Sequence, residues 1–577
     1  MRYVRAMMLA VLASGVTGLA LTGAPAADEP AAKAQLKKAA VQKLKAAAKK
    51  KATDAAKPAE KPVTLPTAAP KPADPLPAPA EPAELARRID ALIDAKLAAE
   101  KVTPSAPAAD AEFLRRASLD LAGVIPSADA ARAFLDDGDP AKRAKLIDRL
   151  LAGDGYGGHL ADLWAAKLFP KDSDNRFVAR EPLHQWLAAE FNAGTPWDEF
   201  VTKLVTATGT VEANPAVTFF LANRSADKLT DAVGTHFLGQ SVSCAQCHNH
   251  PFTALKQTEY WGLAAFFSKV TTPQPRNPKL TGGDNAKLGV GEGTGPSRSK
   301  DFFPESTLKV APHVLDGTPV SVTAAEPYRP VLAKWLTSTA NADFARAAVN
   351  RTWAQLFGRG LVNPVDDMND SNPASHPEVL DLLAGQFAAS QFDLKRLTRT
   401  LMLTDAYQRS SKPTAGNGAD ATLVSHAAMK VMTPEQLYDS LQVLQARAGG
   451  PPKGEKVARP QAFFKGAGSG RDAFVNFFLA GSATANAAEY EAGIPQALRL
   501  MNSRQTLGNT PGAARAFAKP GATPAETLDE MYLATLSRRP TPDETARALA
   551  YLKDAGPTGL ADVLWALTNA SEFVLIR

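Results

Sequence analysis

Apolar residues recur at intervals of three and four along most of the chain, which is the spacing of a helix face that packs on a core. The pattern starts near residue 84 with Leu85, Ile89, Leu92, Ile93 and Leu97. Similar stripes follow at 113–121 and 146–151, whereas alternating strand patterns are scarce. The sequence therefore predicts a mainly α fold from about residue 84 onward.

Four helix starts share one local pattern. Each has a threonine that can cap the helix, a proline at the next position, and an acid or amide three residues after the threonine, which is close to a capping box. The four threonines are Thr195, Thr433, Thr523 and Thr541. Because the sequences that follow them differ, they predict separate helices rather than an internal repeat.

A glycine- and proline-rich break runs from 271 to 325, with a short extended stretch expected around 306–322. It divides the helical part into two predicted blocks, 83–270 and 326–577. Its glycines do not form a phosphate-binding loop, because no GxxxxGK[ST] motif occurs.

The N-terminus carries the marks of a signal peptide. Arg2 and Arg5 precede an apolar run from Ala6 to about Leu21, and small residues follow. We expect residues 1–27 to be removed by cleavage near Ala26 or Ala27, and the mature chain to be exported, either periplasmic or secreted. A membrane anchor is the alternative for this run. No other apolar run is long enough to span a bilayer, so we expect no transmembrane segment in the mature chain.

Residues 28–82 have the composition of a disordered tether, rich in lysine and alanine first and in proline and alanine afterwards. Of the formal net charge of +6, this tether holds +5 and the first 27 residues hold +2, which leaves −1 for the remainder. A nearly neutral folded part argues against a nucleic-acid-binding protein. The tether is interpreted as a spacer, and a basic arm on anionic envelope polymers is the alternative.

The two cysteines of the chain lie in one motif, Cys244-Ala-Gln-Cys247-His248. This CxxCH spacing is typical of covalent haem c attachment, because two thiols one helical turn apart reach both vinyl groups of one porphyrin. The neighbouring His248 is then the proximal ligand of the iron. The motif predicts a haem c-binding site made of Cys244, Cys247 and His248.

Three other interpretations of the motif remain open. The cysteines could form a structural disulfide, or they could hold zinc together with His250 and a fourth ligand. A catalytic thiol–disulfide pair is less consistent with the helical sequence around the motif. No serine-hydrolase or metalloprotease signature occurs, so no catalytic residue is predicted and enzymatic activity stays open.

A second axial ligand for the iron is not identified by the sequence. His250 is too close to His248 along the chain to reach the opposite face. The candidates elsewhere are Met368, Met402, Met429, Met432, Met501, Met531, His159, His184, His236 and His426. Aromatic residues at 260–267 could border a haem, although this spacing is more typical of an ordinary core.

Several segments resemble a planctomycete-type cytochrome-c-like domain of unknown function. They are Phe113–Pro126 (FLRRASLDLAGVIP), Cys244–Phe252 (CAQCHNHPF) and Tyr260–Phe267 (YWGLAAFF). The second block is similar to the planctomycete-specific partner domain of unknown function that usually follows it, on segments such as Asn350–Trp353, Phe357–Leu361 and Ser537–Thr541. One departure is Asn249, where the first family usually has an aspartate.

The resemblance implies a haem-like motif but no demonstrated reaction. The resulting hypothesis is an exported envelope protein that binds haem c and works in electron transfer with an unknown redox partner or envelope component. The alternative is a non-enzymatic binding or assembly protein, whose CxxCH is a disulfide or zinc clip and which is linked to envelope polysaccharide. The sequence does not indicate an oligomeric state.

Overall fold

The computed structural model describes residues 78–169, 180–272, 288–293, 310–323, 325–446, 470–479 and 510–577. The predicted signal peptide, most of the predicted tether and much of the connecting segment lie outside these residues. The described residues all belong to one compact unit. Among them, no helix is both long and apolar enough to cross a bilayer.

The part before residue 272 is built from helices and short 3-10 turns, as the apolar spacing predicts. Its α-helices are α3 (Pro82–Ala99), α4 (Asp110–Ala122), α5 (Ala128–Asp136), α6 (Lys142–Ala152), α7 (Asp154–Leu168), α8 (Glu181–Ala193), α9 (Trp197–Val205), α10 (Thr218–Ala222), α11 (Ala226–Leu238) and α12 (Gln257–Ala265). The 3-10 turns are η1 (Pro215–Val217) and η2 (Ser243–Gln246).

The part after residue 325 is also mainly helical, which confirms the predicted fold class. Its α-helices are α13 (Arg329–Leu336), α14 (Ala342–Phe357), α15 (Pro377–Ala389), α16 (Leu394–Leu403), α17 (Asp405–Gln408), α18 (Pro434–Ala446), α19 (Gly470–Leu479), α22 (Thr510–Phe517), α23 (Pro524–Leu536), α24 (Pro542–Asp554), α25 (Gly559–Thr568) and α26 (Ser571–Val574), with the 3-10 turn η7 (Gly556–Thr558) before α25.

Three of the four predicted threonine starts form as expected. Thr523 and Thr541 close reciprocal capping boxes at α23 and α24. Thr433 does the same at α18, accepting from the Gln436 amide at 3.2 Å while the Gln436 side chain accepts from the Thr433 amide. The start at Thr195 is wrong by one residue: α9 begins at Trp197, and the Thr195 hydroxyl donates to Glu190 instead.

The strands are short and few. β3 (Gly289–Glu292) lies between β1 (Gly209–Thr210) and β2 (Val270–Thr271), antiparallel to both, and β4 (Lys430–Val431) pairs with β5 (Leu575–Ile576). Within the described residues of the connection, β3 is the extended segment, whereas residues 310–323, expected to contribute to an extended stretch, hold no strand. Glu292 on β3 pairs with the buried Arg329 at 2.9 Å, which ties this strand to α13.

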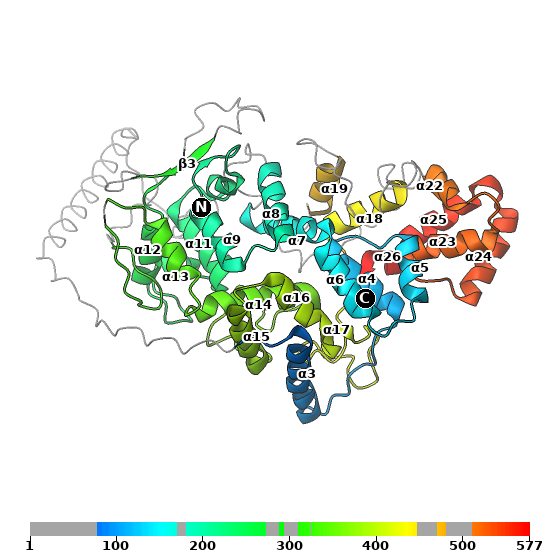
Figure 1. Cartoon of the computed structure of the whole chain (residues 1–577), viewed down its shortest axis with the longest axis horizontal. Coiled ribbons are helices and arrows are strands. Elements are labelled where there is room, and N and C mark those ends of the chain that lie inside the picture. The colour runs from blue at the N-terminus through cyan, green and yellow to red at the C-terminus, as the bar shows by residue number, and fades with distance from the viewer. Residues whose placement is uncertain are drawn as a thin grey trace, which may run out of the picture. The chain divides into compact units, whose positions relative to one another are not determined.

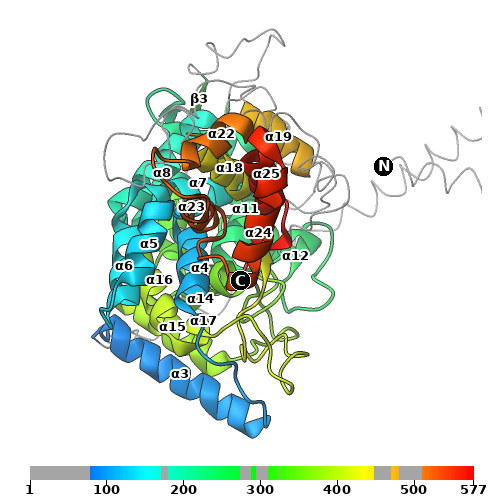
Figure 2. The same cartoon turned by 90° about the vertical axis from the view of Figure 1, so that its right-hand side faces the viewer.

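Helices from the two predicted blocks share one apolar core, which extends from Leu85 to Ile576. α3 packs on α15 and α16, α5 on α23, and α11 on α14. Both views show α3 along α15 and α16 (Figure 1, Figure 2). The glycine- and proline-rich break thus separates the blocks in sequence, while their side chains pack together.

Helix α4 makes buried polar contacts with the second block. The buried guanidinium of Arg115 donates to the carbonyl oxygens of Thr535 and Phe573 at 2.8 and 2.6 Å, and burial lowers its pKa to about 9. Asp120 accepts from the Tyr407 hydroxyl at 2.9 Å and from Lys430 Nζ at 2.6 Å. The FLRRASLDLAG segment therefore forms part of the interface with the second block.

Candidate functional site

The two cysteines lie on one exposed helical turn. η2 carries Cys244, and Cys247 continues it with helical backbone angles of −102° and −26°. Both cysteines are exposed, and their thiols are free. Val242 and Ala245, on the other side of the turn, are fully buried and hold it against the core. The turn thus presents both sulfur atoms to solvent at the spacing of one helical turn.

Hydrogen bonds to Gln246 fix this turn between α11 and α12. The Gln246 carbonyl accepts from Trp261 Nε1 and from Gln257 Nε2, both at 3.0 Å. The Gln246 side chain donates to Asp227 on α11 at 3.3 Å. Because Trp261 is buried, the turn rests on a rigid support, and the positions of the cysteines follow from the packing of α11 and α12.

The ring of His248 is held by a hydrogen bond at Nδ1. Its Nδ1 lies 2.6 Å from the carbonyl oxygen of Asn249, and a carbonyl oxygen only accepts hydrogen bonds, so Nδ1 carries the proton. In a neutral imidazole the lone pair then lies on Nε2, and such a bond from Nδ1 is the usual way a ligating histidine is held. His248 is exposed, which leaves Nε2 accessible.

The orienting bond does not depend on the side chain of Asn249. The backbone carbonyl of Asn249 holds His248, whereas its side-chain oxygen accepts from the Gln257 amide at 3.0 Å, at the start of α12. The departure from the usual aspartate therefore leaves the hydrogen bond that orients His248 unchanged.

His250 has the opposite arrangement. Its Nδ1 accepts from the backbone amides of Phe252 and Thr253, at 3.2 and 3.1 Å. The lone pair of Nδ1 is thus occupied, and the proton of the neutral ring lies on Nε2. In this conformation neither nitrogen of His250 offers a lone pair to zinc. In the described part of the chain, no group of three or more histidine, cysteine or acidic side chains could hold a metal ion.

A buried tyrosine and a carboxyl group lie beneath the motif. The Tyr260 hydroxyl donates to Asp231 Oδ1 and to the Asp227 carbonyl, both at 3.2 Å. Burial raises the pKa of Asp231 to about 6, although the bond from Tyr260 acts in the other direction. Tyr260, Trp261, Phe266 and Phe267 are all buried in the core, so they support the motif from below rather than forming an exposed wall.

A groove with a volume of about 800 Å³ lies beside the motif. Residues 238–242, before the motif, and 250–255, after it, contribute to its lining, while Cys244, Cys247 and His248 stand outside it. Glu259 of α12, Leu315 and Asp316 of the connecting segment, and residues of the second block make up the rest of the lining. Six carboxylates face one arginine in the lining, namely Glu259, Asp316, Asp343, Asp367, Asp370 and Asp381 against Arg346, and burial raises the pKa of Asp343.

The residues that the sequence offered as second axial ligands differ in how exposed their side chains are and in whether they already have hydrogen-bond partners. Met402, Met432, Met531 and His159 lie in the core, and His184 Nε2 is bonded to Asp162 at 2.9 Å. Met429 is exposed, His236 and His426 are half-buried, and Met501 lies outside the described residues. Among these candidates, only Met368 lines the groove beside the motif.

His313 is a candidate that the sequence reasoning missed. Its Nδ1 lies 3.0 Å from the Ala311 carbonyl, so Nε2 carries the lone pair, as in His248. The ring packs directly on Gly262 of α12, where an added Cβ atom would lie 2.1 Å from the ring. His313 falls in the connecting segment, which has no helical periodicity to suggest a partner, so no local pattern in the sequence indicated this contact.

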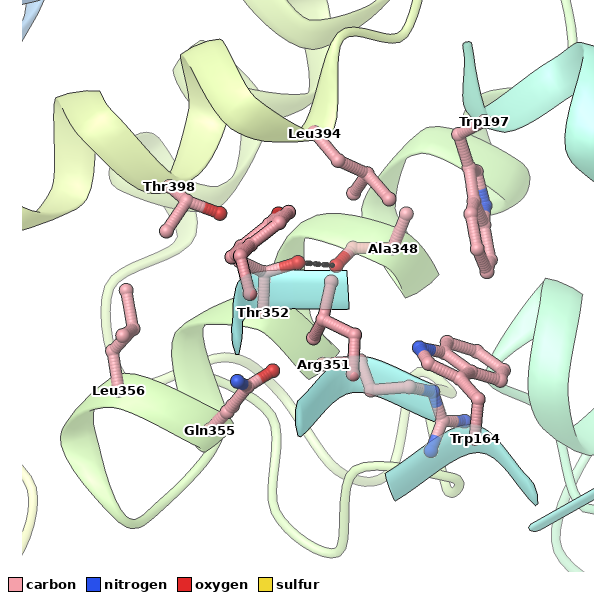
Figure 3. A pocket seen from close by; sticks show the side chains of 11 residues that line it. Trp164, Trp197, Ala348, Arg351, Thr352, Gln355, Leu356, Leu394 and Thr398 are labelled. Atoms are coloured by element: carbon pink, nitrogen blue, oxygen red, sulfur yellow. Dashed lines mark hydrogen bonds between the residues drawn. The ribbon is translucent and has the colours of Figure 1, made fainter. Parts of the chain in front are cut away.

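A second, much smaller cavity lies between α7 and α14 and has a volume of about 30 Å³ (Figure 3). Trp164, Trp197, Arg351 and Thr352 are among the side chains around it. This volume holds one or two water molecules. The cavity is too small for a porphyrin or a sugar, and the large groove is the better candidate for a functional surface.

Together these features define a mainly helical protein with a surface CxxCH turn. Comparison with known families agrees with the expected order of two domains. Residues 88–272 match the family model PSCyt2, described as a protein of unknown function (DUF1549), and residues 328–552 match PSD1, described as a protein of unknown function (DUF1553). The chain therefore contains a PSCyt2 domain followed by a PSD1 domain. No curated protein and no solved structure matches it.

Proposed function

We propose that the protein is an exported carrier of one haem c, attached through Cys244 and Cys247 with His248 on the iron. The observation that carries the proposal is the hydrogen bond from His248 Nδ1 to the Asn249 carbonyl, next to two free thiols on the same exposed turn. A ligand histidine needs this tautomer, and covalent attachment needs this spacing and access.

Each residue of the motif has one task. Cys244 and Cys247 would hold the porphyrin, because each thiol can add across one vinyl double bond, with sulfur joining one carbon and hydrogen the other and no oxidant consumed. His248 would hold the iron through the Nε2 lone pair, and the Asn249 carbonyl accepts from Nδ1 and keeps the ring from rotating. Bound haem supplies one-electron chemistry. The hydrogen bonds from Trp261 and Gln257 to the Gln246 carbonyl would hold the turn in place during electron transfer.

Export is consistent with this proposal. The n-region, apolar run and small residues at 1–27 fit a signal peptide, and haem c is attached outside the cytoplasm. The exposed position of the turn would place the haem edge near the protein surface, where a redox partner in the envelope could approach it.

Expression in a host that matures c-type cytochromes tests the proposal. We expect a Soret band that survives acid–acetone extraction, and Cys247→Ser should abolish stable covalent attachment. His248→Ala and His250→Ala form a matched pair. Under the haem proposal the first loses the spectrum of a histidine-ligated haem, and the second retains it. A colourless wild-type protein with one zinc per chain, lost in His250→Ala, would instead support a zinc clip in a binding or assembly protein.

A further inference from the structure

A third pocket, with a volume of about 100 Å³, lies within the PSD1 domain and shares no lining residue with the groove beside the motif. Three segments line it: residues 353–360 at the end of α14, Ser375 just before α15, and the loop 420–428 that precedes β4. The Ser375 amide donates to the Leu361 carbonyl at 2.7 Å, and a Cβ atom added at Gly358 would lie 3.3 Å from the Cβ atom of Ala428. The first segment is therefore in contact with both of the others.

The loop 420–428 is built around the carboxylate of Asp420. Oδ1 accepts from the amides of Thr422 and Leu423 at 2.8 and 2.7 Å. Oδ2 accepts from the amide and the hydroxyl of Ser425 at 2.9 and 2.5 Å. Burial raises the pKa of Asp420, but these hydrogen bonds outweigh burial and lower the pKa overall. The acceptor positions of this carboxylate are thus used within the loop, and its charge serves the loop itself.

Val424 gives the loop a strained backbone at the pocket. Its φ of +59° lies in the left-handed region, which a β-branched residue rarely adopts. The buried Arg409 donates to the Val424 carbonyl at 2.7 Å, and the Asn417 side chain donates to the next carbonyl, that of Ser425, at 3.4 Å. Strain of this kind persists only where contacts impose it, and it is concentrated at active sites and ligand-binding sites. Val424 itself lines the pocket.

The histidine of this loop is oriented by its neighbour. The Ser425 hydroxyl donates to Asp420, so toward His426 Nδ1, 3.3 Å away, its oxygen is the acceptor. In the neutral ring the proton is then on Nδ1 and the lone pair is on Nε2. His426 is half-buried in the pocket lining, where Nε2 can accept a hydrogen bond from a ligand hydroxyl.

Arg359 supplies positive charge to the pocket. Its side chain is exposed, and it is the one lysine or arginine in the lining. A guanidinium is a planar fork of donors that matches the two oxygens of a carboxylate. Trp353 and Phe357 contribute an apolar surface, with their rings stacked at 4.0 Å. The lining therefore combines a carboxylate-binding group, a hydroxyl acceptor and an apolar wall.

We propose that this pocket binds a hydroxylated organic acid of the size of a sugar acid, with its carboxylate on Arg359 and a hydroxyl group on His426. A neutral sugar lacks the group that Arg359 would pair with. A simple anion such as acetate lacks the hydroxyl that His426 would accept from. The site uses residues of the PSD1 domain alone and needs no haem, so this inference is independent of the proposed function.

The test is isothermal titration calorimetry of the full-length chain with D-glucuronate, D-glucose and acetate. D-Glucuronate and D-glucose share one ring and differ in that the first carries a carboxylate where the second carries a hydroxymethyl group. Arg359→Gln removes the charge, and His426→Phe keeps a ring but removes its nitrogen atoms. Arg149→Gln is the matched control, because Arg149 is an exposed arginine of α6 outside the pocket. Far-UV circular dichroism checks that each variant keeps its helices.

We expect wild type to bind D-glucuronate more tightly than D-glucose or acetate. Arg359→Gln should raise the dissociation constant for D-glucuronate by about tenfold or more, as loss of a charge-assisted hydrogen bond requires, while Arg149→Gln matches wild type. His426→Phe should weaken binding of D-glucuronate but not of acetate. Equal affinity for D-glucose and D-glucuronate, or unchanged binding in Arg359→Gln, overturns the assignment of Arg359. Acetate binding as tight as that of D-glucuronate overturns the role of His426, and a wild-type protein that does not bind D-glucuronate overturns the proposal as a whole.

Discussion

The ion pair between Asp120 and Lys430 allows a quantitative test of how the two family domains are joined. Asp120 is 3% exposed, and the Lys430 side chain is 17% exposed. Burial lowers the pKa of Lys430, which means that the ammonium ion depends on its partner. Removing one partner of such a pair costs about 3–5 kcal/mol, because it leaves a buried charge without compensation.

For Asp120→Asn we expect a loss near the lower limit, about 3 kcal/mol. The reason is that Lys430 keeps two acceptors, the carbonyls of Gln355 and Leu356, at 2.9 and 3.0 Å. Lys430→Met should cost a similar amount, since it leaves the buried Asp120 carboxylate with the Tyr407 hydroxyl. The double variant should lose less than the sum of the two single losses.

The measurement is urea unfolding followed by far-UV circular dichroism, with thermal midpoints as a second readout. Arg399 and Asp148 provide the control, because they form an exposed pair at 2.6 Å whose side chains are 30% and 50% accessible. Asp148→Asn should cost less than about 1 kcal/mol. If Asp120→Asn is no more destabilising than Asp148→Asn, or if the losses of the two buried variants simply add, then this contact does not join the domains as argued.

Two pH-dependent predictions concern single buried groups. Burial raises the pKa of Asp231 to about 6, so the free energy of unfolding of the wild-type protein falls as the pH rises from about 4 to 6 and the buried carboxyl group loses its proton. The Asp231→Asn variant should therefore be about 1–2 kcal/mol more stable than wild type at pH 7, after allowance for solvent screening. Near pH 3.5 the two proteins should be equally stable. An unchanged difference between these two pH values would refute this. Burial and the charge of Lys96 lower the pKa of His376 to about 4. Because the unfolded chain then binds a proton at a higher pH than the folded chain, the free energy of unfolding of wild type should fall by up to about 3 kcal/mol between pH 6.5 and 4. The His376→Gln variant should not show this fall. Parallel pH–stability curves for the two proteins would show that His376 does not titrate in this way.

Much of the local structure could be predicted because it depends on neighbours in the sequence. The apolar stripe at Leu85–Leu97 becomes the buried face of α3, and Thr523 and Thr541 cap their helices through residues three positions away. At Thr195 the helix starts one residue later than predicted, at Trp197, whose amide donates to the distant Phe392 carbonyl at 3.0 Å. The threonine pattern alone does not reveal that contact.

The candidate site was predicted in part for the same reason. The spacing of Cys244, Cys247 and His248 places them on one turn, which a short range of sequence determines. The sequence did not rank the second ligands, however, since Met368 is separated from the motif by more than a hundred residues. His313 was missed because nothing near it in the sequence indicates that its ring packs on Gly262.

The sequence by itself determined the helical class and the CxxCH turn, since periodicity, capping and spacing are local properties. The order of the PSCyt2 and PSD1 domains followed from the resemblance of two stretches of the sequence to known families. Only the tertiary structure decided that α4 buries Asp120 against Lys430, that Arg351 ties loop 366–372 to α11, and that Met368 lies over Gly239. These contacts join residues far apart in the chain. They depend on how side chains of both domains fill one shared core, and no local pattern specifies that packing.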